Sequence, residues 1–229
     1  MSDFAVIKER TDAIRAEMAG YPHAELMAVV KTRSAEEIEY AVNDCGVTLV
    51  GENRVQELIA HEGHYGGAKV HFIGTLQKNK VKYLIGRADM IESVDSAGLA
   101  EEISKRSIAA GLVTDILIEV NTGREPQKSG VMPEALEELL RAVSHLGGVK
   151  LKGLMTVSPA TDDADARRGY FAMLRRLRDE NAGYFSGGGI LSMGMSDSYR
   201  EALEEGADIV RIGTGIFGKR QKKAQNAEK

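Results

Sequence analysis

Lys31 is the residue whose position in this sequence first suggests chemistry. It follows the apolar residues 27–30 in the stretch MAVVKTR, where the pattern predicts a buried strand that ends at an amine. An ammonium group is strongly hydrated, so a buried strand end is costly for it unless a charged partner or a covalent bond compensates. Burial also favours the neutral amine, which is a nucleophile. The alternative interpretation is a surface lysine whose ammonium reaches solvent past its apolar stem.

Ser196 and the pair Gly213-Thr214 could bind an anion together. Ser196 begins a predicted helix over residues 196–206, so its hydroxyl and the amides that follow would lie where the helix dipole favours negative charge. Gly213 and Thr214 follow the last predicted strand and would add backbone donors from the neighbouring loop. Taken singly, Ser196 could be only a helix cap and Gly213 only a turn residue. Their placement after the last two predicted strands favours a phosphate site.

Arg211 supplies a permanent positive charge within the last predicted strand, DIVRIGT. The period of two along a strand separates it from Val210 and Ile212, which would face the helices, so we expect its guanidinium to point toward the mouth of a barrel. A cation there needs an acceptor. A phosphate or a ring nitrogen would serve, and the alternative is a carboxylate of the barrel such as Glu52 or Glu119.

These features together are typical of one kind of cofactor site. An amine after the first strand, an anion site after the last two strands and a cation from the last strand suit a phosphorylated aldehyde held as a Schiff base. Pyridoxal 5′-phosphate (PLP) is such an aldehyde. The sequence therefore predicts that Lys31 binds its aldehyde carbon while the loops after the last two strands bind its phosphate.

Eight short apolar segments predict the strands that would position these residues. The segments are residues 24–31, 47–52, 69–75, 89–94, 114–121, 149–157, 189–194 and 208–214. Helical patterns separate them, for example the one that opens with Ser34 and Glu37 in capping-box spacing. Such repeats form either a closed barrel or an open doubly wound sheet. Their even spacing favours a single (β/α)8 TIM barrel, an α/β fold, with an additional N-terminal helix in residues 1–18.

The composition restricts the classes of partner. The chain has 229 residues, is 43% hydrophobic and carries a formal net charge of -4, which describes a globular protein without a field that attracts nucleic acid or membranes. We predict one domain over residues 1–229, with a flexible solvated tail at 219–229, and no membrane partner. The basic tail leaves open a scaffold that binds RNA or a protein. The single cysteine, Cys45, argues against a disulfide framework and favours the cytoplasm.

Two other patterns lack the partners that their chemistry needs. Residues 213–218 fit G-x-G-x-x-G, but too few residues follow for the second strand and ribose-binding acid of a dinucleotide site. His61 and His64 are three residues apart, yet no converging set of carboxylates or cysteines accompanies them. We therefore interpret both histidines as surface residues and predict no metal site.

Four segments carry a resemblance to a known family: AVVKTRSAEEIEYAVNDCGVTLVGENRVQE, VHFIGTLQKNKVKYL, GLMTVSP and LSMGMSDSYREALEEGADIVRIGTGIFG. They resemble the motifs of the pyridoxal phosphate homeostasis protein family, a fold type III barrel similar to the N-terminal domain of alanine racemase. The resemblance implies that Lys31 holds PLP as a Schiff base and that Arg211 faces the pyridine nitrogen. It also implies phosphate binding by Ser196, Gly213 and Thr214.

The same resemblance extends to further residues. Asn53 of GENRVQE would line the pocket, and Lys128 of EPQKSG matches a family lysine near the pocket without an assigned role. The sequence departs from the family at Val30, where serine is more frequent, and at Arg33, where lysine is frequent.

The family resemblance and the position of Arg211 favour binding over catalysis. An arginine opposite the pyridine nitrogen disfavours ring protonation and weakens the electron sink that amino-acid chemistry needs. We also expect no racemase-like C-terminal domain or second base. The leading hypothesis is a cytoplasmic monomer for intracellular PLP homeostasis, which holds and releases PLP or other B6 vitamers and contacts apo PLP-enzymes transiently. The alternative is a small PLP-dependent amino-acid racemase or lyase.

Overall fold

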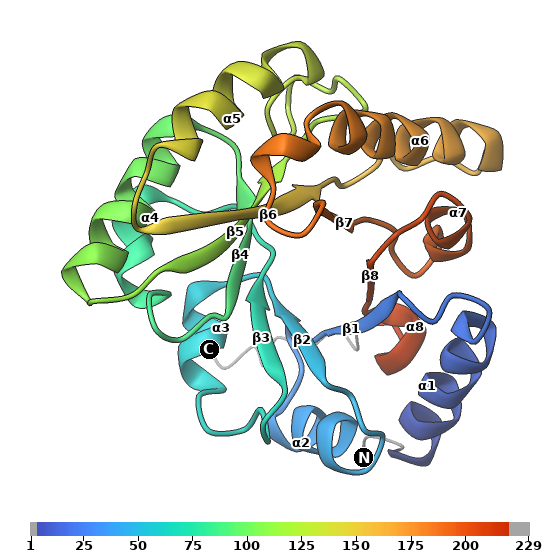
Figure 1. Cartoon of the computed structure of the whole chain (residues 1–229). Coiled ribbons are helices and arrows are strands. Elements are labelled where there is room, and N and C mark those ends of the chain that lie inside the picture. Colours follow the sequence, from blue (N-terminus) through green and yellow to red (C-terminus); the bar gives the residue numbers. More distant parts are fainter. Residues whose placement is uncertain (1–3, 220–229) are drawn as a thin grey trace, which may run out of the picture.

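The computed structural model describes residues 4–219 and shows a closed barrel of eight parallel strands in sequential order (Figure 1). The strands are β1 (Glu25–Val29), β2 (Leu49–Glu52), β3 (Lys69–Phe72), β4 (Met90–Val94), β5 (Thr114–Glu119), β6 (Val149–Met155), β7 (Ile190–Ser192) and β8 (Ile209–Ile212). Pairing of β1 with β8, with Met27 opposite Arg211, closes the ring. The predicted TIM barrel is confirmed, and every strand lies within its predicted segment.

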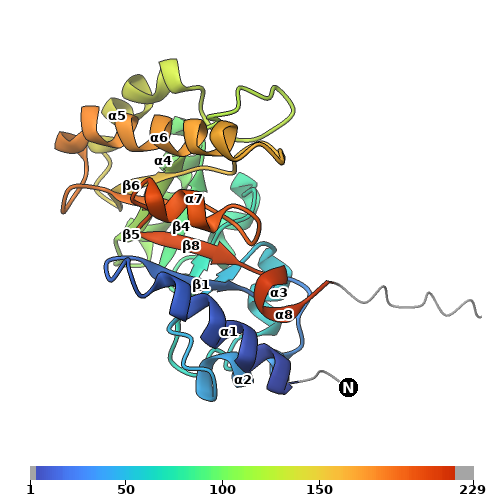
Figure 2. The ribbon, with the colours of Figure 1, turned by 90° about the vertical axis from the view of Figure 1, so that its right-hand side faces the viewer.

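Helices surround this barrel and connect successive strands (Figure 1). They are α1 (Phe4–Met18), α2 (Ala35–Asn43), α3 (Val55–Ala60), α4 (Ala97–Ala109), α5 (Leu136–Ser144), α6 (Ala164–Glu180), α7 (Tyr199–Glu204) and α8 (Thr214–Phe217), with 3-10 helices η1 (Lys78–Tyr83), η2 (Pro133–Ala135) and η3 (Ala182–Tyr184). The connection after β3 forms the 3-10 helix η1, where the helical pattern of the sequence indicates an α-helix. The predicted N-terminal helix α1 packs beside α8 (Figures 1 and 2).

The alternation of side chains along each strand divides the core into two parts. The larger part lies between the strands and the helices and includes Val210 and Ile212. The smaller part lies inside the barrel and consists of two clusters. Their buried members are Met27, Leu49 and Ile209 in one and Met90, Leu117 and Met155 in the other. Arg211 shares the inner face with Ile209, as the period of two predicts.

Ser34 and Glu37 form the predicted capping box at the start of α2. Ser34 Oγ accepts a hydrogen bond from the Glu37 amide at 3.3 Å, and Glu37 Oε2 accepts one from the Ser34 amide at 2.9 Å. This box begins α2 immediately after the turn that contains Lys31. The helix start therefore limits the positions available to that turn.

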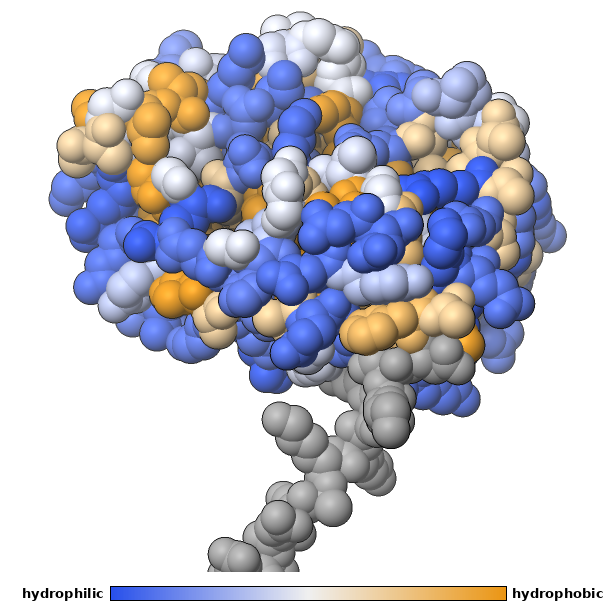
Figure 3. Space-filling view, turned by 90° about the horizontal axis from the view of Figure 1, so that it is seen from below, coloured by the Kyte–Doolittle hydropathy of each residue, from blue (hydrophilic) through white to orange (hydrophobic). Residues whose placement is uncertain are grey.

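The surface is described for residues 4–219 only. Across this range, none of the helices combines the length and the apolar character that crossing a membrane requires. The face in Figure 3 is largely hydrophilic, with apolar side chains in small separate patches. From residue 220 onward, the predicted tail at 219–229 lies outside the described residues.

Replacement of Gly153 tests how closely β6 approaches β7. A Cβ there would lie 2.0 Å from the Ile190 carbonyl oxygen. We expect Gly153→Ala to lower the free energy of unfolding by about 2 kcal/mol, measured by urea denaturation. The matched control is Gly169→Ala within α6, where a Cβ meets nothing within 4 Å and should stabilise by roughly 0.5–1 kcal/mol. Equal stabilities of the two variants would contradict this packing.

Candidate functional site

Lys31 lies just beyond the end of β1, half-buried, at the end of the barrel where the strands finish. The chain turns there, since the Arg33 amide donates to the Val30 carbonyl at 3.0 Å. Thr32 adopts φ 63°, a left-handed conformation that is rare for a β-branched residue and costs of order 1–3 kcal/mol. Glu57 of α3 holds this conformation, because its Oε2 accepts the Thr32 amide at 3.1 Å.

Arg33 attaches the Lys31 turn to α8. Its Nη2 donates to the Gly218 carbonyl at 2.9 Å and its Nη1 to the Phe217 carbonyl at 3.4 Å. The guanidinium also lies over the Phe217 ring, 5.3 Å from its centroid, and pairs with Glu37 at 3.7 Å. A planar fork with several donors suits two adjacent carbonyls better than a single ammonium does. The departure from the family's lysine at this position therefore has a structural consequence.

Ser196 joins the loops that follow β7 and β8. Its Oγ accepts hydrogen bonds from the amides of Gly213, at 3.3 Å, and Gly215, at 3.1 Å. The prediction that Ser196 begins a helix is wrong, because α7 begins at Tyr199 and follows Ser198. Ser198 Oγ instead accepts the Met195 amide at 3.1 Å, which holds this segment as a turn.

These bonds leave the Ser196 hydroxyl hydrogen directed away from the two amides, because a hydroxyl oxygen that accepts two bonds still donates one. Gly213 precedes α8, and Thr214 is its exposed first residue. A Cβ on Gly213 would lie 3.5 Å from the Val29 carbonyl oxygen at the end of β1. The structure therefore brings Ser196, Gly213 and Thr214 together next to the strand that leads to Lys31.

Arg211 is enclosed within the barrel, with 4% of its surface exposed. Its Nη1 donates to Ser192 Oγ at 2.8 Å, and its Nη2 donates to the Thr156 carbonyl at 2.7 Å. Burial lowers the pKa of the Arg211 guanidinium from its ordinary value, whereas the charges of Glu92 and Glu119 oppose that shift. Arginine nevertheless keeps its charge in proteins.

The alternative acceptors predicted for Arg211 have other partners. Glu52 Oε1 accepts from Tyr65 at 3.0 Å and lies 2.7 Å from His61 Nδ1, on the side of β2 that faces the helices. Glu119 Oε1 accepts from Ser129 Oγ at 2.9 Å. The prediction of an ion pair between Arg211 and one of these carboxylates is therefore wrong.

Asn53 follows β2 and contributes an acceptor to the same end of the barrel. Its Oδ1 is buried and has no hydrogen-bond donor among the described residues. An unsatisfied buried acceptor costs about 1–3 kcal/mol, so this oxygen fits a ligand that offers a donor. Gly74 permits the placement, since a Cβ there would lie 2.1 Å from the Asn53 carbonyl oxygen.

Lys128 lies between the loops that follow β5 and β6. Its Nζ is 2.5 Å from Glu125 Oε2 and 3.5 Å from the Ser158 carbonyl oxygen. The ammonium is thus neutralised locally by a carboxylate of its own loop. This contact explains how Lys128 is held and leaves it without an assigned part in binding.

The two histidines of the rejected metal motif are not alike. His61 is 8% exposed and bonded to Glu52, so the prediction of a surface histidine is wrong for it. His64 is partly exposed, and its Nδ1 lies 2.8 Å from Glu39 Oε1. Within residues 4–219, no group of three or more His, Cys, Asp or Glu side chains is arranged to hold a metal ion.

Three interior polar residues were missed by sequence reasoning: His71 of β3, Glu92 of β4 and Ser192 of β7. His71 is hydrogen bonded to Glu92, Glu92 accepts a hydrogen bond from Ser192, and Ser192 accepts one from Arg211. A signal existed, because each residue follows an apolar residue that faces the helices. Parity along a single strand, however, does not reveal which strands face each other across a barrel.

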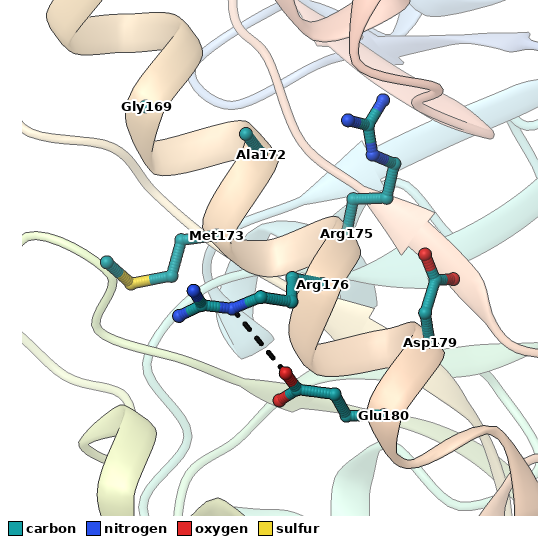
Figure 4. Close-up of a pocket in the computed structure, with 7 residues that line it drawn as sticks. All are labelled: Gly169, Ala172, Met173, Arg175, Arg176, Asp179 and Glu180. Atoms are coloured by element: carbon teal, nitrogen blue, oxygen red, sulfur yellow. Dashed lines mark ion pairs between the residues drawn. The ribbon is translucent and has the colours of Figure 1, made fainter.

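A pocket of about 520 Å³ lies on the outer side of α6 (Figure 4). All of its lining residues belong to that helix, among them Met173 and Arg175, and Arg176 pairs with Glu180 across it at 3.7 Å. It is therefore separate from the loops around Lys31 and is not part of the candidate site.

Comparison with known proteins agrees with this barrel. Residues 2–221 match the model of the alanine racemase N-terminal domain family. The chain is 46% identical over 201 residues to the pyridoxal phosphate homeostasis protein of Aquifex aeolicus, which covers 86% of this chain and 88% of that relative. The chain therefore belongs to the alanine racemase N-terminal domain family and to the pyridoxal phosphate homeostasis proteins within it.

Solved structures show the same architecture. PipY of Synechococcus elongatus with PLP bound has a TM-score of 0.83 and 32% identity, with coverage of 93% of this chain and 100% of PipY. Alanine racemase of Corynebacterium glutamicum has a TM-score of 0.77 at 15% identity, with coverage of 95% of this chain and 62% of the racemase. The similarity to alanine racemase concerns the fold alone.

The contact between Arg33 and α8 predicts a measurable local effect. Arg33→Lys keeps the charge but loses the two-carbonyl fork, and bonds of this charged type contribute about 1.5–3 kcal/mol. We expect amide hydrogen exchange in residues 31–34 to accelerate about tenfold or more. The control Arg141→Lys changes an exposed pair with Glu137 and should leave this exchange unchanged. Unchanged exchange in both variants would contradict the attachment.

Proposed function

We propose that this chain binds PLP through Lys31 and serves in PLP homeostasis, holding and releasing the cofactor without catalysing a reaction on amino acids. One observation carries the proposal: Arg33 ties the Lys31 turn to α8, and the amides at the start of α8 lie against Ser196. This arrangement supports the proposal, since it would hold the Lys31 amine close to a group that binds the phosphate. The relative PipY, 32% identical, has been solved with PLP bound.

Each residue of the site would have a distinct part in binding. The Lys31 amine condenses with the aldehyde to form a C=N bond and release water, and hydrolysis of that bond returns the amine and the aldehyde. The Ser196 hydroxyl would donate to the phosphate, with Gly213 and Thr214 beside it. Arg211 would face the ring nitrogen, and the orphaned Asn53 Oδ1 would accept a donor at the pocket wall.

The charge of Arg211 supports binding without turnover. Bound PLP supplies an electron sink that is strongest when its ring nitrogen is protonated. A buried guanidinium beside that nitrogen disfavours the additional positive charge. The alternative function is a small PLP-dependent racemase or lyase, which the fold shared with alanine racemase favours. Exchange with other B6 vitamers or apo-enzymes, a monomeric state and a cytoplasmic location stay predictions.

Replacement of Lys31 tests the attachment point. After incubation with PLP, reduction with borohydride and trypsin digestion, mass spectrometry should find the phosphopyridoxyl group on the peptide that contains Lys31. Lys31→Ala should lose this adduct and its visible absorption. The control Lys69→Ala removes an exposed amine at the start of β3, far from the strand ends that carry the site. A reducible adduct of undiminished yield on another lysine in Lys31→Ala would refute the assignment.

Proton exchange at amino acids distinguishes a binding protein from an enzyme. We expect the PLP-loaded protein in deuterium oxide to exchange the Cα hydrogen of each L-amino acid no faster than free PLP at equal concentration, measured by NMR. The reason is the weakened electron sink beside Arg211. Rapid exchange of one amino acid that depends on Lys31 would establish the alternative function.

A further inference from the structure

A chain of hydrogen bonds crosses the inside of the barrel from Arg211. Ser192 Oγ accepts from Arg211 Nη1 at 2.8 Å and donates to Glu92 Oε2 at 2.5 Å. Glu92 Oε1 lies 2.6 Å from His71 Nδ1. The four residues come from β8, β7, β4 and β3, so the chain joins opposite sides of the ring (Figure 1). All four are buried.

Glu92 provides the charge that balances Arg211. The direct acceptors of the guanidinium are a hydroxyl and a backbone carbonyl, which are neutral. Burial raises the pKa of the Glu92 carboxyl, but the interactions with His71, Arg211 and Ser192 outweigh burial, so that its pKa lies below its ordinary value. Glu119 is the other nearby carboxyl, and burial raises its pKa. The carboxylate of Glu92, two hydrogen bonds away, is therefore the stronger counter-charge.

The same chain determines how the guanidinium is oriented. Ser192 and the Thr156 carbonyl engage two different nitrogens of one planar group, and this fixes its plane. Two of the five N–H donors are used, so others remain for a ligand. Because Glu92 accepts the Ser192 hydrogen, the lone pairs of Ser192 Oγ stay directed at Arg211. Loss of the carboxylate would free the hydroxyl to rotate.

We propose that Glu92 is a positioning residue of the cofactor site, which acts through Ser192 to fix the Arg211 guanidinium and thereby sets the electronic state of the ring bound against it. This inference rests on the proposed function, in which Arg211 faces the ring nitrogen of PLP. Glu92 touches no ligand in this scheme. Its effect reaches the cofactor only through the guanidinium that it orients and balances.

Another buried glutamate of the protein, Glu52, provides a matched control for Glu92. Glu52 is also fully buried, and its Oε1 is 2.7 Å from a histidine Nδ1, that of His61. Glu52 differs in its side of the sheet, since it faces the helices and is bonded to Tyr65. Substitution of either glutamate by glutamine replaces a buried carboxyl with little change of shape, and burial raises the pKa of the Glu52 carboxyl. Only Glu92→Gln interrupts a chain that ends at Arg211.

The first measurement uses the absorption spectrum of the PLP-loaded full chain between pH 5 and 10. The groups that face Glu92 are His71, Ser192 and Arg211, and none of them changes in E92Q. In E92Q the Arg211 guanidinium loses its counter-charge, and the unbalanced cation disfavours the protonated chromophore on Lys31. E92Q should therefore move the spectroscopic midpoint about 0.5 pH unit lower. E52Q should leave the midpoint unchanged.

Two further variants separate positioning from general destabilisation. S192A should shift the midpoint in the same direction as E92Q, and the double variant should shift it no further, because both changes interrupt one path. Additive shifts would overturn the inference. If E92Q does not fold, S192A decides the same question, since it interrupts the path at the next residue.

The second measurement needs no cofactor. In the unloaded protein, NMR of arginine Nη–H groups should show a slowly exchanging Arg211 signal, assigned by its loss in R211K. E92Q should shift this signal and accelerate its exchange about tenfold, whereas E52Q should not. Failure of the wild type to take up PLP would refute the proposed function, and the Arg211 signal alone would then decide the positioning role. Normal PLP uptake with an unmoved midpoint and signal in E92Q would refute only the present inference.

Discussion

Pairing of β1 with β8 is the constraint on which the arrangement of the site depends. It places Met27 opposite Arg211, and the segments that follow β1 and β8 lead side by side to Lys31 and Gly213. Residues separated by most of the sequence thus become neighbours without any long loop. Arg33 strengthens this proximity because its fork holds the carbonyls at the end of α8. The strained Thr32 conformation is tolerated because contacts on both sides hold the turn in place.

The inside of the barrel has an apolar part and a polar part, and the polar part contains the charged side chains of Arg211 and Glu92. Clusters of methionine and branched aliphatic side chains fill the apolar part and exclude water. Charges beside such a region interact strongly, which makes an unbalanced guanidinium costly. The hydrogen bonds from Arg211 to Ser192 and from Ser192 to Glu92 offset part of this cost. A rigid cation of defined orientation is the result.

The sequence predicted features that depend on local periodicity. The strands, the inward face of Arg211 and the capping box at Ser34 follow from spacing within a few residues. The start of α7 was missed because Ser196 and Ser198 are both acceptable caps, and only the contact of Ser196 with Gly213 decides between them. The partners of Arg211 and the burial of His61 depend on register and packing between separate elements. No single-strand pattern contains that information.

The fold shared with alanine racemase does not itself decide between binding and catalysis, because a barrel only provides positions for side chains. Under the proposed function, the group opposite the ring nitrogen governs ring protonation, which a carboxylate would favour and the Arg211 guanidinium would oppose. In this chain the guanidinium is held by neighbours that keep it charged and fixed, so the ring would meet an unchanging cation. Under the proposed function, a site built in this way would allow reversible attachment at Lys31 and would weaken the electron sink that amino-acid chemistry needs. The proposed function therefore depends on the hydrogen bonds inside the barrel as well as on Lys31 at its rim.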